Sequence, residues 1–154
     1  MPAGPRSVIV VVMTTTRVKP SIGQATAERL STRFGAVFET FDAEDLFAPD
    51  AFFDLNMPVW RLQLEGADVF AAQLRAMSRG AVRLEVLRTV ATASGFVAEH
   101  EERQDDGREV FSARRLWLCE VHDGRITEVI GYCSGEWDEA LRTRHSAEAP
   151  MVRA

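Results

Sequence analysis

Two polar side chains stand two residues apart in an apolar stretch: Asp54 and Asn56, within residues 52–58. Alternation along a β-strand places such residues on one face of the strand. If that face lines a closed cavity, a carboxylate and an amide project into apolar surroundings, which is typical of a small-molecule site. A carboxylate held there is poorly solvated, so its pKa rises and it can exchange protons near neutral pH. The segment therefore predicts a pocket but does not name the ligand.

Composition argues against several other classes of protein. The chain has 154 residues, enough for one domain with a real core, and a formal net charge of −5 with the two signs interspersed. Nucleic-acid binding needs a clustered basic face, so no nucleic-acid partner is expected. The apolar run at residues 8–13 is too short to span a membrane and lacks signal-peptide features.

The two cysteines, Cys119 and Cys133, show neither metal-type nor disulfide-type spacing, which predicts reduced thiols and a cytoplasmic location. A nucleophilic role for Cys133 is the alternative. With three histidines in the chain and no further cluster, neither a metal nor a cofactor is expected.

The chain divides into an N-terminal extension at residues 1–23, a domain at 24–145 and a tail at 146–154. Met13 is a candidate for the true start, because a polar run follows it. The alternative is a short N-terminal strand that docks on the domain.

Hydrophobic spacing predicts three helices before a run of strands. Apolar residues at three- and four-residue spacing mark a helix at 24–41, whose inner stripe is Leu30, Phe34, Val37, Phe38 and Phe41. A short helix at 42–47 ends before Pro49, a strand follows at 51–57, and a helix spans 66–77 with Val69, Phe70, Leu74 and Met77 inside. The period then changes to two, which predicts strands at 82–92, 95–104, 108–121 and 126–134, before a short helix or irregular tail at 137–145. This order indicates an α+β fold.

The turn at Asp106-Gly107 sets the pairing of the two strands beside it. A two-residue turn places His100 opposite Ala113, and it places Glu99 opposite Arg114, an opposite-charge pair that favours this register. A three-residue loop is the alternative and shifts the pairing by one residue.

This order of elements resembles the NTF2-like fold, a cone formed by a curved antiparallel sheet around helices. Within that superfamily the chain is similar to SnoaL-like, limonene-epoxide-hydrolase-like and ketosteroid-isomerase-like proteins. The resemblance covers about residues 24–137 and rests on DLNMP at 54–58 with Gly66, AEHEE at 98–102, and DGRIT at 123–127 leading to Gly131 and Tyr132. It implies an internal cavity and a homodimer. The reaction must be argued from the site, because this fold hosts isomerases, cyclases, hydrolases and transport factors.

On that fold, the predicted register puts His100, Glu102 and Arg115 on the concave face, and the resemblance brings Asp54 and Asn56 to the same cavity. In the alternative register, Glu99 and Glu101 face the cavity in place of His100 and Glu102. The rest of the expected lining is Phe96, Ala98, Phe111, Trp117 and Cys119, with Val129, Gly131 and Cys133 from the last strand. A lining of this kind suits an aromatic or terpenoid ligand.

Each polar group in this lining has a predicted role. His100 and Asp54 are expected to handle protons, with Glu102 beside them, because a carboxylate fixes the tautomer of a neighbouring histidine. Asn56 and Arg115 are expected to stabilise a substrate oxygen as charge develops on it. The remaining substrate contacts are predicted to be Trp60, Phe96, Trp117 and Cys133.

Two positions depart from the related families. Epoxide-hydrolase-like members carry an acid on the last strand, where this chain has Gly131, and ketosteroid-isomerase-like members carry an oxyanion-stabilising acid near Trp117. Of the three family patterns, the SnoaL-like pairing of a histidine with an acid is the one that this chain matches best, through His100.

The sequence thus favours a cofactor-independent cyclase or isomerase for a polyketide-, terpenoid- or steroid-like molecule. One alternative is a protein that binds such a ligand without changing it, and another is an assembly module. Individual residues also have structural alternatives: Asp54 as a strand-end cap, His100 as a hydrogen-bonded interior residue, and Arg115 as a neutralising partner of Glu102 or Asp54.

Overall fold

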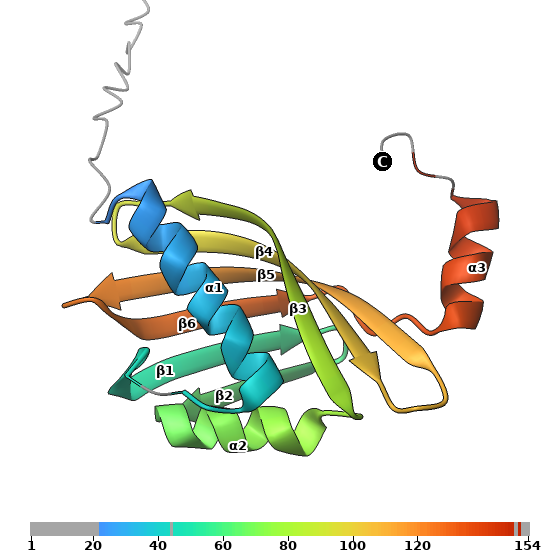
Figure 1. Cartoon of the computed structure of the whole chain (residues 1–154), viewed down its shortest axis with the longest axis horizontal. Coiled ribbons are helices and arrows are strands. Elements are labelled where there is room, and N and C mark those ends of the chain that lie inside the picture. Colours follow the sequence, from blue (N-terminus) through green and yellow to red (C-terminus); the bar gives the residue numbers. More distant parts are fainter. Residues whose placement is uncertain (1–21, 44, 150, 152–154) are drawn as a thin grey trace, which may run out of the picture.

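A six-stranded mixed sheet carries helices on its concave face (Figure 1) in the computed structural model, which describes residues 22–43, 45–149 and 151. The strands lie in the order β2-β1-β6-β5-β4-β3, and every neighbouring pair is antiparallel except β1 and β6. The helices are α1 (Gln24–Thr40), α2 (Ala67–Met77) and α3 (Glu139–Glu148). The strands are β1 (Phe47–Met57), β2 (Trp60–Glu65), β3 (Ala81–Ala91), β4 (Gly95–Asp105), β5 (Val110–His122) and β6 (Arg125–Cys133).

This architecture confirms the predicted α+β class and the long helices. The sheet is curved but not closed (Figure 1). Residues 1–21, with the candidate start at Met13, lie outside the described residues.

The core forms where α1 and α2 lie against the sheet. The predicted stripe of α1 is buried at Leu30, Phe34, Val37 and Phe38, whereas Phe41 ends the helix in a left-handed conformation and is half-buried. Aromatic rings fill the space beneath, with centroids 5.0 Å apart for Phe34 and Trp117 and 4.1 Å apart for Phe53 and Phe70. Burial of each such side chain contributes roughly 1.5–3 kcal/mol, so this aromatic cluster dominates the packing.

The short helix predicted at 42–47 is wrong. Leu46 lies in a turn, where its N–H donates to the Ala43 carbonyl, and Phe47 already begins β1. Both side chains are buried, and the Leu46 carbonyl accepts a hydrogen bond from the N–H of Ile126. Core packing and cross-strand pairing therefore override a weak helical pattern, and Pro49 falls where the pairing of β1 with β6 is irregular, a place that tolerates proline.

The hairpin of β1 and β2 was not predicted. Met57 pairs with Trp60, so Pro58 and Val59 form a two-residue turn. The signal in the sequence was the alternation after the turn, where Leu62 and Leu64 are partly buried between exposed polar neighbours.

In α2 the prediction is confirmed at Phe70, which is fully buried, but it is wrong at Val69, which is 49% exposed. Ala71 is buried in its place. Fewer apolar side chains of α2 are buried against the rest of the protein than the sequence predicts.

The predicted register of β4 and β5 is wrong by two residues. His100 pairs with Arg115 and Glu101 pairs with Arg114, across a four-residue loop in which the Asp106 carboxylate accepts the N–H groups of Arg108 and Glu109. A shift of two keeps every side chain on its face, so the predicted concave set survives although its cross-strand partners change.

The last helix, α3, begins at an Asp138 cap, whose carboxylate accepts the N–H of Leu141 at 2.7 Å. None of its residues is buried, and it stands away from the sheet (Figure 1). A backbone bridge between Ser112 and Trp137 ties its base to β5.

Candidate functional site

A buried ion pair lies on the concave face of β4 and β5. Glu102 and Arg115 both point inward, and their side chains are 3% and 7% exposed. Arg115 Nε is ion-paired with Glu102 Oε2, and Arg115 Nη2 donates to Glu102 Oε1 at 3.0 Å. Gln104, two residues further along β4, donates its amide to the same carboxylate. The sequence placed Glu102 and Arg115 on this face correctly, but it gave no role to Gln104.

The surroundings of this pair hold the charge on Arg115. Burial by itself lowers the pKa of the guanidinium, but the negative charge and hydrogen bonds of Glu102 outweigh that effect and raise the pKa. Arg115 is therefore a fixed cation inside an apolar region, beside a carboxylate that it neutralises.

A small cavity of about 30 Å³ adjoins the pair. Its polar lining is Glu102, Gln104, Arg115, Ser78 and Glu136, and its apolar walls are Phe38, Phe41, Leu55, Met57, Leu74, Met77, Val82 and Trp117. This space holds one or two water molecules and is far below the several hundred Å³ of a typical ligand pocket. Aromatic rings from α1 and β5 fill the remainder of the interior.

His100 lies on the same face but in a different environment. Its Nε2 is 3.1 Å from the hydroxyl of Ser31 on α1, its Nδ1 has no partner among the described residues, and the side chain is fully buried. Burial lowers the pKa of His100 from 6.5 to about 4, so the ring is neutral near pH 7. His100 does not line the cavity. Ser31 was missed by sequence reasoning, although a serine inside the apolar stripe of α1 was a usable signal.

Asp54 and Asn56 share a face as predicted, but it is the convex face. Leu55 and Met57, between and after them, point into the cavity instead. The Asp54 carboxylate accepts a bidentate pair of hydrogen bonds from Arg61 of β2, at 2.9 and 2.5 Å, and a third from Gln63 at 3.2 Å. The hydrogen bonds from Arg61 hold the pKa of Asp54 below 3.8. The predicted convergence of Asp54 with His100 is therefore wrong.

The predicted oxygen-binding partner Asn56 is also outside the cavity. Its amide donates to the Gly131 carbonyl at 3.3 Å, which links β1 to β6. This bond joins neighbouring strands and leaves Asn56 away from Arg115, contrary to the expected convergence.

Of the residues predicted to contact the substrate, some lie at the cavity and others lie away from it. Trp117 lines the cavity, Phe96 is a core residue that is 1% exposed, and Trp60 is 71% exposed beside the hairpin turn. Cys133 is half-buried, and its sulfur accepts the N–H of Gly135. Burial raises the pKa of the Cys119 thiol, so that cysteine is inert at neutral pH.

Gly131 explains one departure from the epoxide-hydrolase-like pattern. A Cβ atom at this position would lie 2.3 Å from Cζ3 of Trp117 and 3.3 Å from Cδ2 of Leu55. The indole ring therefore occupies the space that an acidic side chain on the last strand would need. The two departures from the related families, Gly131 and Trp117, therefore have one cause, because the ring of Trp117 packs directly over Gly131.

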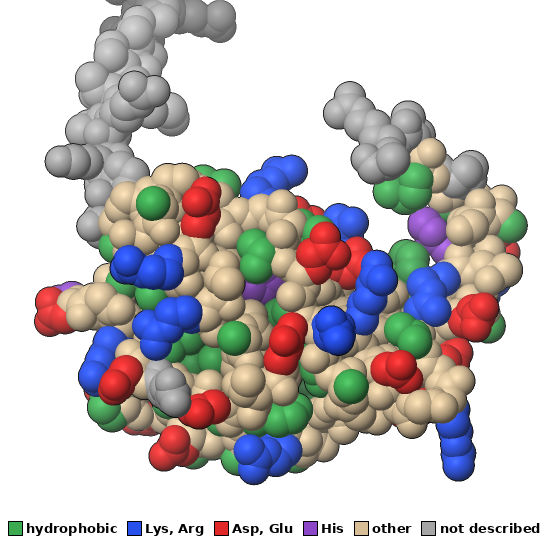
Figure 2. Space-filling view, viewed as in Figure 1, with side chains coloured by type: hydrophobic (Ala, Val, Ile, Leu, Met, Phe, Trp, Pro, Cys, Tyr) green, Lys and Arg blue, Asp and Glu red, His purple; other side chains and the backbone are tan. Residues whose placement is uncertain are grey.

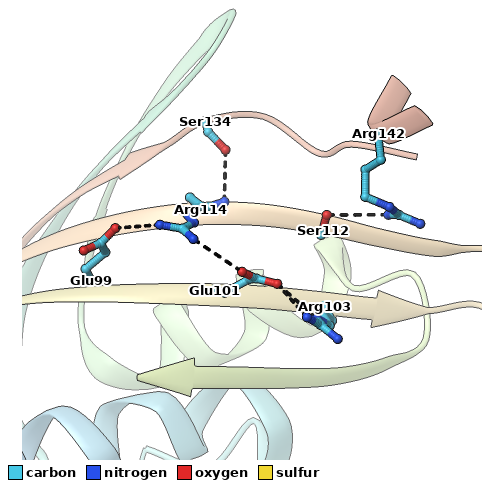
Figure 3. Close-up of polar contacts among 7 residues, drawn as sticks. All are labelled: Glu99, Glu101, Arg103, Ser112, Arg114, Ser134 and Arg142. Atoms are coloured by element: carbon cyan, nitrogen blue, oxygen red, sulfur yellow. Dashed lines mark hydrogen bonds and ion pairs between the residues drawn. The ribbon is translucent and has the colours of Figure 1, made fainter. Parts of the chain in front are cut away.

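The convex face carries a surface charge network (Figure 3). Three of its residues, Glu101, Arg114 and Ser134, also line an open hollow of about 560 Å³ between the sheet and α3. Arg114 lies between Glu99 at 3.1 Å and Glu101 at 3.8 Å, and Arg103 also contacts Glu101. Because Arg114 reaches two glutamates spaced two residues apart, the opposite-charge argument could not distinguish the true register from the predicted one. The N–H of Arg114 donates to Ser134, which extends the network to the end of β6.

Basic and acidic side chains are also interspersed over the face seen in Figure 2. Within the described part of the chain, no helix has both the length and the apolar composition needed to cross a bilayer. Across those same residues, no three His, Cys, Asp or Glu side chains gather so that they could hold a metal ion.

Comparison with known proteins identifies the fold. No family model and no curated protein sequence matches the chain. Solved structures do match: an LEH-like epoxide hydrolase from Mycobacterium tuberculosis has 21% identity and a TM-score of 0.59, with 72% of this chain and 84% of the other covered. An NTF2-like protein from Anabaena variabilis has 14% identity and a TM-score of 0.61 over 80% and 96% of the two chains.

A third similar structure is a Xanthomonas campestris protein assigned provisionally as a polyketide cyclase. It has 23% identity and a TM-score of 0.54, over 71% of this chain and 90% of the other. These likenesses show that the chain has an NTF2-like fold, which confirms the predicted resemblance. At such low identity they do not define a reaction.

Proposed function

We propose that the protein binds a small, largely apolar molecule in the cavity beside Glu102 and Arg115 and transforms it without a cofactor. The observation that carries this proposal is the buried ion pair at the base of an apolar cavity. Such a pair stabilises a fold no better than well-packed apolar residues would, so its presence is a reason to suspect function. A reaction of the cyclase or isomerase kind, on a polyketide-, terpenoid- or steroid-like compound, fits this chemistry.

In this mechanism Glu102 moves the proton and Arg115 stabilises the oxygen. The carboxylate would abstract a proton next to a substrate carbonyl, while the guanidinium would donate hydrogen bonds to the oxygen as it becomes negative. Trp117 Nε1 is buried without a partner in the described residues, and it offers a further donor for the ligand. His100 is too far inside the core to share this step, so the proposal replaces the predicted pair of His100 and Asp54.

Ligand binding requires the cavity to expand. Three of its wall residues, Met57, Leu74 and Met77, are only partly buried. Methionine side chains adopt many shapes at little cost, so they can move aside for a ligand. The alternative function, ligand binding without catalysis, uses the same cavity and needs the same movement.

Proton exchange distinguishes catalysis from binding. The protein is incubated in D₂O with a panel of cyclic ketones, and deuterium incorporation next to the carbonyl is followed by NMR. Catalysis predicts exchange with the native protein and its loss in Glu102→Gln, with line broadening of the bound ketone retained. Binding without exchange in the native protein favours the alternative. The control is Asp54→Asn, which leaves exchange unchanged because Asp54 lies on the other face.

We also keep the homodimer and the cytoplasmic location as proposals. Leu116, Leu118 and Tyr132 adjoin one another on the convex face and are 42%, 39% and 51% exposed. They lie on β5 and β6, the two central strands of the sheet, beside the charged pair of Arg114 and Glu99, and this position suits contact with a second copy. Light scattering tests this: Leu118→Glu is expected to convert a dimer into a monomer, and a native monomer would contradict it.

The free thiols of Cys119 and Cys133 are compatible with a reducing compartment.

A further inference from the structure

Two loops border one side of the cavity, and we take this side as its mouth. One is residues 78–80, between α2 and β3, and the other is residues 134–138, between β6 and α3. Ser78 from the first loop and Glu136 from the second both line the cavity. Any molecule that reaches Arg115 from this side must pass between them.

An ion pair bridges these loops. Arg79 Nε lies 2.9 Å from Glu136 Oε2, and the Arg79 guanidinium carbon lies 4.6 Å from the centre of the Phe111 ring. The cation is therefore held both by a carboxylate and by an aromatic face. The two charged side chains are 52% and 26% exposed, so salt screens their attraction and the contact can break readily.

The same loop is connected to the buried carboxylate. The N–H of Arg79 donates to Gln104 Oε1 at 2.9 Å, and the Gln104 amide donates to Glu102. Movement of residues 78–80 would therefore remove a partner from the residue that orients Glu102. On the opposite loop, Gly135 has a φ of 93°, a conformation that favours glycine and places Glu136 at the mouth.

We propose that the Arg79–Glu136 ion pair is a latch across the mouth, which must open before a ligand can reach Glu102 and Arg115. Gln104 acts as a positioning residue that links the latch to Glu102. This inference rests on the proposed function in taking the cavity as the binding site. It adds that access to the cavity depends on salt and on these two side chains.

Acrylamide quenching of Trp117 fluorescence tests the latch without a substrate. The chain has three tryptophans, so Trp60→Phe and Trp137→Phe together leave Trp117 as the only tryptophan, which is excited selectively at wavelengths where tyrosine does not absorb. In this background, Arg79→Ala and Glu136→Gln should each raise the quenching constant about threefold, the size of effect expected from removing a half-exposed pair. The reversed pair, Arg79→Glu with Glu136→Arg, should restore the low value.

Matched controls separate access from unfolding. Arg114→Ala removes an ion pair with Glu99 whose side chains are 60% and 30% exposed, close to those of the latch, and should leave quenching unchanged. Added NaCl should increase quenching in the background protein but not in Arg79→Ala. Equal quenching in all these proteins, with equal thermal midpoints, overturns the latch.

If a variant unfolds, the salt response of the intact background protein decides the question, and its absence counts against the latch. Acrylamide is not a substrate, so the latch can fail while the ketone exchange of the proposed function persists. Conversely, ketone exchange can be absent while the quenching experiment still shows the latch.

Discussion

Two of the arginine–carboxylate pairs of this protein lie on opposite faces of the same sheet. Arg115 and Glu102 on the concave face have side chains that are 7% and 3% exposed, whereas Arg61 and Asp54 on the convex face are 63% and 11% exposed. Both pairs make more than one contact, so their geometry is alike. Their surroundings differ, because water screens the outer pair and helices exclude water from the inner one.

This difference makes the inner pair the candidate for the proposed chemistry. Removing solvent strengthens the attraction between the inner charges, but it also makes either charge costly without the other. Loss of the outer pair is expected to have little consequence, and neither of its residues lines the cavity beside Glu102. The four predictions below test this contrast between the faces, from the largest expected effect to the smallest.

Loss of the inner cation should have the largest effect. Arg115→Leu leaves Glu102 buried without its counter-ion, which is expected to lower the free energy of unfolding by about 3–5 kcal/mol. Urea denaturation followed by circular dichroism measures this loss. In the double variant Arg115→Leu with Glu102→Leu, most of the loss should be recovered. A loss in Arg115→Leu no greater than that in Arg61→Leu would remove the distinction between the faces.

The buried histidine should make the concave side sensitive to acid. Because the pKa of His100 is about 4 in the folded protein and 6.5 normally, protonation favours the unfolded chain. The contribution of His100 to the free energy of unfolding is therefore fully present above pH 6.5. It is lost as the pH decreases to 4, by roughly 3 kcal/mol in total. Unfolding free energies measured across this range should show the slope, and His100→Gln should flatten it while His122→Gln does not.

Acid sensitivity of the convex pair falls in a separate range. The pKa of Asp54 is held below 3.8 by its hydrogen bonds from Arg61, so its contribution is present above that pH and is lost only as the pH falls further. Persistence of the slope between pH 6.5 and 4 in His100→Gln would assign it to other groups and contradict the role of His100.

The packing of Trp117 over Gly131 should be intolerant of a methyl group. A Cβ atom there would clash with the indole ring, so Gly131→Ala is expected to cost about 1–3 kcal/mol. Thermal unfolding measures the cost. Adding Trp117→Phe, which provides a smaller ring, should recover part of it, and failure of this rescue would indicate that the backbone rather than the ring limits the position.

The smallest effect is expected for the outer pair. Asp54→Asn keeps the shape of the side chain and exchanges an ion pair whose arginine is exposed for neutral hydrogen bonds, so the melting temperature should change little. Binding of any ketone that the native protein recognises should also be unchanged. A large loss of ketone binding in Asp54→Asn would show that Asp54 belongs to the binding site. It would contradict the conclusion that only the concave face carries the site.

Much of the fold could be predicted from periodicity. The stripe of α1 from Leu30 to Phe38 and the alternation in β3 to β6 are strong patterns, and both were confirmed. The failed elements were short: residues 42–47 satisfied a helical pattern over less than two turns, and β2 followed a proline that hid its alternation. Short segments take their conformation from the partners they meet, which local preference does not specify.

The candidate site was predicted only in part, for a related reason. Alternation correctly indicated that Glu102 shares a face with His100, and that Asp54 shares one with Asn56. Alternation also puts Gln104 on the face of Glu102, so this hydrogen-bonding partner could have been found from the sequence. The contact of His100 with Ser31 joins a strand to a helix 69 residues earlier, which alternation does not specify.

By itself the sequence determined the class of fold, the two main helices and the sets of residues that share a face. Only the tertiary structure decided that Asp54 faces outward, opposite to Glu102. A strand's alternation is symmetric between its two faces, and the symmetry is broken only where α1 and α2 cover one side of the sheet. Burial then turns one arginine–carboxylate pair into a candidate site and leaves the other as a surface contact.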